Sequence, residues 1–359
     1  MAAILMGILV VNLFVTGALS IGVCNGGLGD NLPSDREVVR LYKLNGIEKM
    51  RIYAPKQETL QALRGSNIQL ILDAPNPQEL ACDPSFALQW VQTNVMTYYP
   101  DVKFHCIAVG NEVNLDSNMA QYVFPAMKNV HNALISMGLG DKIKVSTATS
   151  SVLLGVSYPP SEGSFSDEAR LFMDPIIKFL VETKSPFLVN IYPYFAYKGN
   201  PQDIQLSYAL FTAPEIVVSD QGLKYTNLFD AMLDSTYAAL EKVGGSDLEV
   251  IVSESGWPSY GGFAASEENA GTYYRNLVNH CKSGNGTPRR AGKPIDVYLF
   301  AMFDENLKNG VETEKHFGLF TPNKQPKYQL TFSGGSQLAK RVKELSLFLL
   351  VLHLGRHVL

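Results

Sequence analysis

The chain has 359 residues, of which 46% are hydrophobic and 18% are charged. This balance is typical of a well-packed globular protein and not of a disordered one, and the length fits one large domain or two ordinary ones. Because the formal net charge is −4, nothing in the composition favours a cationic surface for phosphates, and we expect no nucleic-acid partner.

The first 20 residues have the pattern of a secretory signal peptide. An apolar run ends at Ala18 and Ser20, small residues in the arrangement that signal peptidase accepts. The first charged residue is Asp30, so the usual basic start is missing, and a buried or transmembrane helix is the alternative interpretation. No stop-transfer charge cluster follows. We therefore favour a cleaved signal at residues 1–20 and expect no stable membrane span.

Short apolar runs rich in β-branched residues alternate with segments of helical spacing from residue 21 onward. The predicted strands lie near residues 21–23, 49–53, 69–72, 106–109, 143–147, 187–192, 249–253 and 297–303. The predicted helices include residues 34–43, 59–65, 86–98, 119–137, 167–183 and 227–243. Eight strands alternating with helices predict one catalytic domain, a (β/α)8 TIM barrel over residues 21–332. An open doubly wound sheet is the alternative, but no G-x-G-x-x-G turn follows the first strand.

Two segments stand apart from this alternation. Residues 194–221 are polar and punctuated by proline and glycine, which predicts a long excursion on the top face of the barrel. The tail, residues 333–359, passes from small residues through a basic stretch to an apolar run too short to span a bilayer. It is interpreted as a possible sorting propeptide or as a loosely packed appendage.

Two glutamates each follow a strand-like apolar run. One is Glu112 in "CIAVGNEVN", preceded by Asn111, and the other is Glu254 in "VIVSESGWPS", close to Trp257. In a barrel, the C-terminal strand ends form one rim over a packed interior, so these carboxylates can face each other across a cleft. Such a pair suits glycosidic bond cleavage, in which one carboxyl protonates the leaving oxygen and the other attacks or activates water. Structural ion pairs at the rim are the alternative.

Further polar and aromatic residues fall at the same rim. The segment "FAMFDENLKNG" at the eighth strand brings Asp304, Glu305 and Lys308 into close succession, where a cation can hold a carboxylate ionised. It can also be a solvated charge cluster. Rings placed at or beyond strand ends can stack on sugar faces or belong to the core: Tyr53, Tyr192, Tyr194, Phe195, Trp257 and Phe303.

Other chemistries find little support in the sequence. The six histidines are scattered without H-E-x-x-H spacing, and no G-x-S-x-G elbow occurs at a strand end. The four cysteines show no C-x-x-C pair; some could pair in a secreted protein, but buried free thiols are the preferred interpretation. We therefore expect neither a metal nor a cofactor. The sequon at Asn285 is a candidate N-glycosylation site in a secreted chain.

Several long motifs occur in order along the chain: "IGVCNGGLGDNLPS", "MRIYAP", "IAVGNEV", "VSTATSSVLLGVSYPPSEGSF", "NIYPYFAY", "VSESGWPSYGG" and "EKHFGLFTPNKQPKY". With these motifs the chain resembles plant endo-β-1,3-glucanases of glycoside hydrolase family 17. The resemblance covers nearly all of residues 21–332. It implies a (β/α)8 fold and retaining hydrolysis of β-1,3-glucan, a defence-type activity on fungal walls and callose.

The resemblance also implies roles for particular residues. Glu112 would be the acid/base and Glu254 the nucleophile, with Glu305, Lys308 and Glu314 as a supporting charged network. Tyr53 would line the cleft. From these positions we expect the substrate-binding residues to be Tyr53, Asn111, Tyr192, Trp257 and Phe303. The expected partner is β-1,3-glucan polysaccharide, and we expect a monomer in the extracellular space or the vacuole.

Two positions depart from the family pattern on the substrate rim. Asn25 stands where the family usually has tyrosine, and Ala54 where it usually has aspartate. Losing an aromatic platform and a carboxylate should weaken glucan binding or change subsite preference. The alternative function is therefore a glucan-binding protein on the same barrel with weak or lost turnover.

Overall fold

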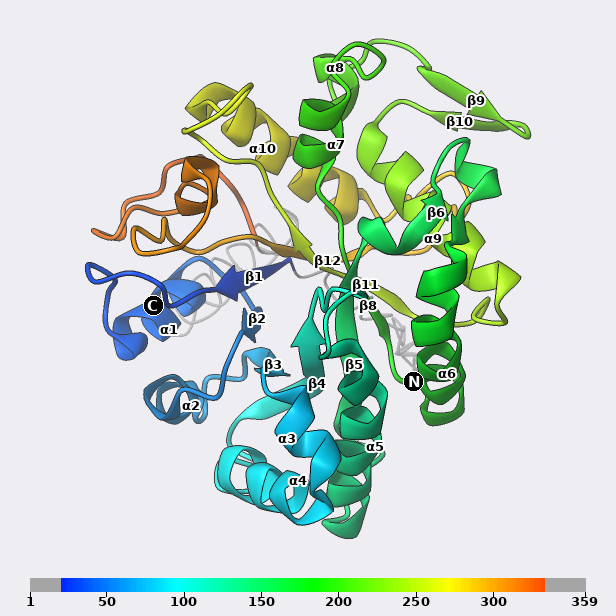
Figure 1. Ribbon diagram of the computed structural model, residues 1–359. Helices are drawn as coiled ribbons and strands as arrows, with labels where there is room; N and C mark the ends of the chain where they lie inside the picture. The colour runs from blue at the N-terminus through cyan, green and yellow to red at the C-terminus, as the bar shows by residue number, and fades with distance from the viewer. Residues whose placement is uncertain (1–20, 333–359) are drawn as a thin grey trace, which may run out of the picture.

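The computed structural model describes residues 21–332, which form a closed parallel barrel surrounded by helices (Figure 1). The predicted signal peptide and the predicted C-terminal tail lie outside the described residues. Around the barrel the strands follow their order in the chain, and every pairing is parallel. The predicted TIM barrel is confirmed and the open doubly wound sheet is excluded.

The eight barrel strands appear where the sequence predicted them, with shifted ends. They are β1 (Gly22–Asn25), β2 (Lys49–Ile52), β3 (Gln69–Ala74), β4 (Lys103–Asn111), β5 (Lys144–Ser150), β8 (Phe187–Asn190), β11 (Val250–Ser255) and β12 (Asp296–Leu299). The prediction for the eighth strand was too long, because β12 ends at Leu299 and Phe303 makes only an isolated bridge with Phe320. The seventh strand continues two residues further than predicted and contains Glu254.

The helices lie outside the barrel (Figure 1). They are α1 (Asp35–Leu44), α2 (Gln57–Leu63), α3 (Pro77–Cys82), α4 (Pro84–Val91), α5 (Ala120–Ser136), α6 (Asp167–Thr183), α7 (Pro193–Gly199), α8 (Leu206–Ala209), α9 (Leu228–Lys242) and α10 (Glu267–Ser283). A π-helical turn η1 (Gln92–Met96) continues α4, so the single helix predicted over 86–98 consists of two parts. None of the helices within residues 21–332 is long and apolar enough to cross a bilayer.

Short helical turns and two-stranded hairpins lie in the loops between the main elements. They are η2 (Ser151–Leu153), the hairpin of β6 (Leu154–Val156) and β7 (Ser164–Phe165) with η3 (Pro160–Glu162) between them, the hairpin of β9 (Val218–Asp220) and β10 (Leu223–Tyr225), and η4 (Glu312–Lys315). The predicted excursion over residues 194–221 carries most of α7, all of α8 and strand β9.

Helix α10 was not predicted, although its local signals are complete. The Ser266 hydroxyl accepts a hydrogen bond from the Asn269 amide at 3.2 Å, which caps the first turn, and Glu267 and Glu268 favour the positive end of the helix dipole. Gly284 ends the helix in the left-handed conformation, with a φ of 71°. The inner face, which includes Tyr273, is buried against the barrel.

The barrel wall separates two apolar cores, and the strand alternation decides which residue enters which. In β4, Ile107 and Val109 pack outward under the helices, while Cys106 and Ala108 face the barrel interior. The inner core is filled by side chains from several strands, from Ala108 and Ala148 to the large ring of Tyr298, as expected for a packed barrel and not a pore. Three of the four cysteines are buried free thiols as predicted, but Cys82 is exposed.

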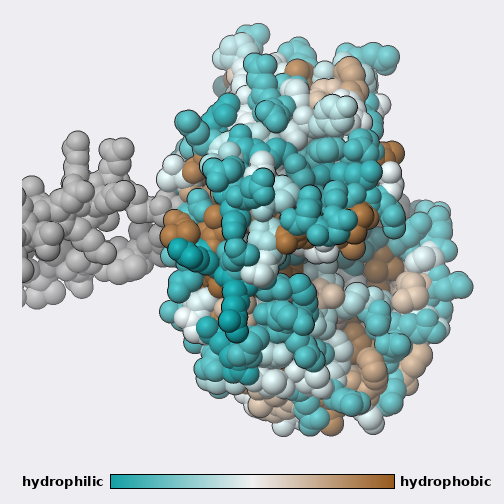
Figure 2. Space-filling model, turned by 90° about the vertical axis from the view of Figure 1, so that its left-hand side faces the viewer, coloured by the Kyte–Doolittle hydropathy of each residue, from teal (hydrophilic) through white to brown (hydrophobic). Residues whose placement is uncertain are grey.

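After β12 the chain forms no further α-helix before residue 332 but folds back beside β1 and α1 (Figure 1). The Met302 amide donates to the Cys24 carbonyl at 2.8 Å, and the Leu307 amide donates to the Leu28 carbonyl at 3.0 Å. The side of the molecule that carries this segment is mostly hydrophilic, with hydrophobic residues in small separate groups (Figure 2). This return of the chain builds one wall of the rim described next.

Candidate active site

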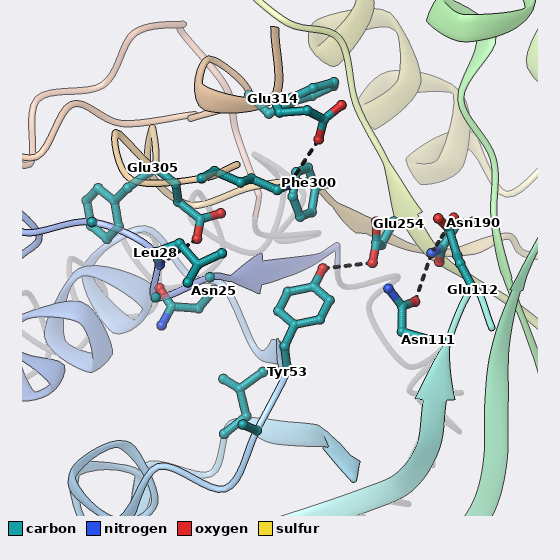
Figure 3. Close-up of a pocket in the computed structure, with 18 of the residues that line it drawn as sticks. Asn25, Leu28, Tyr53, Asn111, Glu112, Asn190, Glu254, Phe300, Glu305 and Glu314 are labelled. Atoms are coloured by element: carbon teal, nitrogen blue, oxygen red, sulfur yellow. Dashed lines mark hydrogen bonds and ion pairs between the residues drawn. The ribbon is translucent and has the colours of Figure 1, made fainter. Parts of the chain in front are cut away.

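Both predicted catalytic glutamates lie at the C-terminal ends of barrel strands and line one cleft (Figure 3). Glu112 directly follows β4 and Glu254 is the fifth residue of β11. The cleft has a volume of about 1270 Å³, larger than the pockets that enclose single small molecules. It is therefore large enough to hold several units of an oligomeric ligand.

Irregular strand pairing aims these side chains into the cleft. Along β11, Ile251 faces the barrel interior and Val252 faces outward, so strict alternation would turn Glu254 outward. The pairing of β11 with β8 shifts between Val252 and Glu254, and the pairing of β4 with β5 shifts between Ala108 and Asn111. Such bulges bend a strand and redirect its side chains, often beside active sites. Here they bring Asn111 and Glu254 to the interior side.

The carboxylate of Glu254 is held by three hydrogen bonds. Its Oε1 accepts from Arg51 Nη1 at 2.9 Å and from the Tyr53 hydroxyl at 2.8 Å, and its Oε2 accepts from the Tyr192 hydroxyl at 2.6 Å. Burial raises the pKa of both tyrosines well above its usual value, so both hydroxyls keep their protons and act as donors. Glu254 is 6% exposed, and its position in the cleft is fixed by these contacts.

Arg51 is fully buried and connects most of the polar floor of the cleft. Its Nε and Nη2 donate to the two carboxylate oxygens of Asp73 at 3.1 and 2.7 Å, and Nη2 also donates to Asn111 Oδ1 at 2.9 Å. Burial alone would lower the pKa of Arg51, but the negative charges of Asp73 and Glu254 raise it well above its usual range. A permanent positive charge therefore lies beside the carboxylate of Glu254.

Glu112 has different surroundings. Its Oε1 accepts one hydrogen bond, from Asn190 Nδ2 at 3.0 Å. The residue as a whole is exposed, but its carboxyl lies between the cleft walls, where burial and the charge of Glu254 raise its pKa. The backbone of Glu112 has a φ of 47°, in the left-handed region, a conformation that costs free energy in a non-glycine residue and occurs often at functional sites.

Aromatic rings form the walls near the glutamates. Tyr192 contacts Phe195, Phe300 and Phe317, with ring centroids 5.3, 6.3 and 5.9 Å away. Of the predicted substrate-binding rings, Tyr53, Tyr192 and Phe303 line the cleft, although Phe303 is only 4% exposed. Asn111 also lines it. Phe195, 40% exposed, offers a more open face for stacking on a sugar.

The predicted charged network divides into two parts. Lys308 Nζ pairs with Glu314 Oε2 at 3.1 Å and lies 4.3 Å from the centre of the Phe300 ring. Glu305 instead accepts a hydrogen bond from the Leu28 amide at 2.8 Å, so its carboxylate holds the loop after β1. A Cβ on Gly26 would lie 2.3 Å from the Glu305 oxygens, and only glycine allows this close approach.

Trp257 does not belong to the cleft, so its prediction as a substrate-binding residue is wrong. Its side chain is fully buried among Tyr194, Tyr197 and Tyr273, and its Nε1 donates to the Ala264 carbonyl at 2.9 Å. A ring without exposed surface cannot stack on a sugar. The chain turns away from the cleft at Gly256, whose added Cβ would lie 2.3 Å from the Phe300 carbonyl oxygen, and this turn carries Trp257 into the core.

Three residues of the polar floor were not predicted: Arg51, Asp73 and Asn190. Their signal in the sequence was a polar or charged side chain inside an apolar strand, as in "MRIY", "LILDA" and "FLVN". Buried polar and charged side chains are rare unless they are paired. Each of these positions therefore indicated a side chain with a polar partner inside the barrel. No group of three or more metal-ligating side chains occurs in the part of the chain that the structure describes.

The comparison with known families agrees with this geometry. The pattern of "Glycosyl hydrolases family 17" matches residues 21–332. The chain belongs to this family. A glucan endo-1,3-beta-glucosidase from Vitis vinifera is 61% identical over 335 residues, covering 92% of this chain and 96% of the relative. The basic vacuolar isoform GLB of this enzyme from Nicotiana tabacum is 54% identical, covering 93% of this chain and 92% of the relative. The solved structure of a β-1,3-glucanase and allergen of Cryptomeria japonica pollen is 45% identical in sequence with a TM-score of 0.85, and the match covers 88% of this chain and 99% of that chain.

The position of Trp257 predicts separate effects on stability and on substrate binding. Trp257→Phe should destabilise the protein by about 1–3 kcal/mol, because it removes packed volume and the indole N–H that donates to the Ala264 carbonyl, which keeps only the donor from Asn269 Nδ2. The KM for β-1,3-glucan should change by less than about twofold. Thermal unfolding and steady-state kinetics measure the two effects, and a large rise in KM at unchanged stability would contradict the core assignment.

Proposed function

We propose that this family 17 protein hydrolyses internal β-1,3-glucosidic bonds of β-1,3-glucans, with Glu112 as acid/base and Glu254 as nucleophile. The observation that supports it most directly is the pairing of two unlike carboxyls in one cleft, one clamped beside Arg51 and the other with a raised pKa. Pairs of carboxyls with diverging environments are typical of enzymes that need a base and an acid at the same pH.

The contacts suggest how the reaction proceeds. Glu112 donates its proton to the leaving glycosidic oxygen while the Glu254 carboxylate attacks the anomeric carbon, which forms a glycosyl-enzyme ester. Glu112, now ionised, takes a proton from water, and the resulting hydroxide releases the sugar with retention. Arg51, Tyr53 and Tyr192 orient the attacking oxygens of Glu254. This orientation lowers the activation free energy, because the carboxylate loses less conformational entropy when it attacks.

The substrate class follows from the size and lining of the cleft and from the relatives. A large cleft with aromatic walls, in which Lys56 and Lys308 are each paired with a carboxylate, suits a neutral polysaccharide segment. The relatives named above are glucan endo-1,3-beta-glucosidases, and a defence-type role on fungal walls and callose fits this activity. The cleft is complete within one chain, which supports action as a monomer. A glucan-binding protein without turnover is the alternative, which the experiments below distinguish.

Removing the nucleophile is the first test. Glu254→Gln should lower kcat on laminarin by at least about 10³-fold, with the fold and glucan binding retained. Glu254→Gly with added azide should regain turnover and yield an α-glycosyl azide, because the small anion attacks from the vacated face. The control is Glu182→Gln, an exposed residue of α6, which should behave as wild type. Near-normal turnover of Glu254→Gln would favour a structural ion pair.

The acid/base role of Glu112 predicts a particular pH dependence. In the wild type, kcat/KM should fall on the alkaline side as Glu112 loses its proton, at a pH above the ordinary value of 4.5 because its pKa is raised. Glu112→Gln should largely spare formation of the glycosyl-enzyme from aryl glucosides with good leaving groups, and this step should no longer show the alkaline limb. Pre-steady-state release of the aryl group across the pH range measures both. If the rate still falls on the alkaline side in this variant, the group that titrates there is not Glu112.

We also propose entry into the secretory pathway, with cleavage after Ser20 and a glycan on Asn285. Asn285 is exposed in the loop between α10 and β12, at the end of the barrel opposite the cleft. The mature protein from a plant secretory host should begin at Ile21, and Asn285→Gln should remove the mass that a glycosidase releases from the wild type. N-terminal sequencing and mass spectrometry test both points. An intact Met1 terminus recovered from the cytosol would contradict secretion.

A further inference from the structure

The cleft extends beyond the catalytic pair into the space between the ends of β1 and β2 and the first turns of α1 and α2. We call this extension the side chamber; it is lined by Asn25, Asp35, Val38, Ala54, Lys56 and Thr59. In Figure 3, Asn25 lies on the far side of the Tyr53 ring from Glu254. The chamber is therefore continuous with the catalytic region but lateral to it.

Two short side chains keep the side chamber open. Asn25 ends β1 and pairs in register with Ile52, the last residue of β2, and Ala54 follows two positions later. Because parallel neighbouring strands end at the same edge of the barrel, both side chains stand at the chamber entrance. An aromatic side chain at either position would occupy space that the cleft now includes.

The chamber lining contains an acceptor that lacks a donor. Asn25 Oδ1 is buried and has no hydrogen-bond partner among residues 21–332. A buried acceptor without a partner costs free energy, which a ligand hydroxyl group placed there would recover. The floor is closed by Val38 and Thr59, which are 5% and 3% exposed, so the chamber combines an apolar surface with polar groups at its edge.

The charges of the chamber favour a neutral ligand. Lys56 Nζ pairs with Asp35 Oδ2 at 2.7 Å, and the Thr59 hydroxyl donates to Asp35 Oδ1. Phosphate or carboxylate recognition needs positive charge that no local carboxylate already neutralises. The Asp35–Lys56 pair provides donors and acceptors without a net charge, which suits the hydroxyl groups of a sugar.

We propose that the side chamber binds a single β-1,6-linked glucosyl branch carried by a β-1,3-glucan main chain. In a β-1,3-linked chain the free hydroxyls are on C2, C4 and C6, and the hydroxymethyl group of C6 extends furthest from the ring. A substituent on O6 is therefore the one that reaches sideways from a main chain lying over Glu112 and Glu254. This proposal rests on the proposed hydrolysis of β-1,3-glucan and adds that branched segments are accepted at the cleavage site.

The experiment compares a linear β-1,3-gluco-oligosaccharide with one of equal main-chain length that carries one β-1,6-glucosyl branch. Ala54→Phe, which narrows the entrance, should lower the ratio of kcat/KM for the branched to the linear substrate by about tenfold. Asn25→Leu removes the unpaired acceptor at similar size and should lower this ratio by about fivefold. Leu171→Phe, at an exposed position of α6 that is 84% exposed, is the matched control and should leave the ratio unchanged.

Binding measurements separate the side chamber from catalysis. In a Glu254→Gln background, calorimetry gives the dissociation constants for both oligosaccharides, and adding Ala54→Phe should weaken only the branched one. Equal effects on both substrates, in kinetics and in binding, would overturn the chamber assignment while the hydrolase assignment stands. Wild-type protein that fails to cleave even the linear chain would overturn the hydrolase assignment, and the binding comparison would still decide whether the chamber recognises the branch.

Discussion

The arrangement of the site depends on one buried guanidinium. Arg51 donates to Asp73, Asn111, Asn190 and Glu254 from the middle of the barrel, with no exposed surface. Removing one partner of a buried ion pair typically costs about 3–5 kcal/mol, whereas an apolar replacement of the whole group is often neutral or stabilising. The buried charge is therefore poorly explained by stability alone. Its position explains how four strands hold their polar side chains around one guanidinium beneath the cleft.

The same interaction makes the two glutamates chemically different. Glu254 has Arg51 and two tyrosine hydroxyls within hydrogen-bond distance. Glu112 has one amide donor, and burial of its carboxyl together with the negative charge of Glu254 raises its pKa. Asn190 links the two environments, because its Nδ2 donates to Glu112 while its Oδ1 accepts from Arg51 and Ser253. One network thus gives the two carboxyls different hydrogen-bond partners and different electrostatic surroundings.

The outer walls of the cleft come from segments that follow the barrel strands and are not part of the sheet. Glu305 fixes the loop after β1 through Leu28, and the Lys308–Glu314 pair packs its ammonium group over Phe300. Phe195 comes from α7, within the excursion that follows β8. The barrel therefore sets the height of the reacting carboxyls, and the longer loops set the width of the cleft above them.

The sequence by itself determined the barrel, the order of its strands and the placement of Glu112 and Glu254 at strand ends, because apolar periodicity and strand termination are local properties. The tertiary structure alone decided where the side chains point. Bulged pairing turns Glu254 inward against its expected alternation, and the turn at Gly256 buries Trp257, which sequence position had placed on the substrate. Arg51 and Glu254 are 203 residues apart in the chain and 2.9 Å apart in space. Such contacts depend on strand register and barrel closure, which no short stretch of residues encodes.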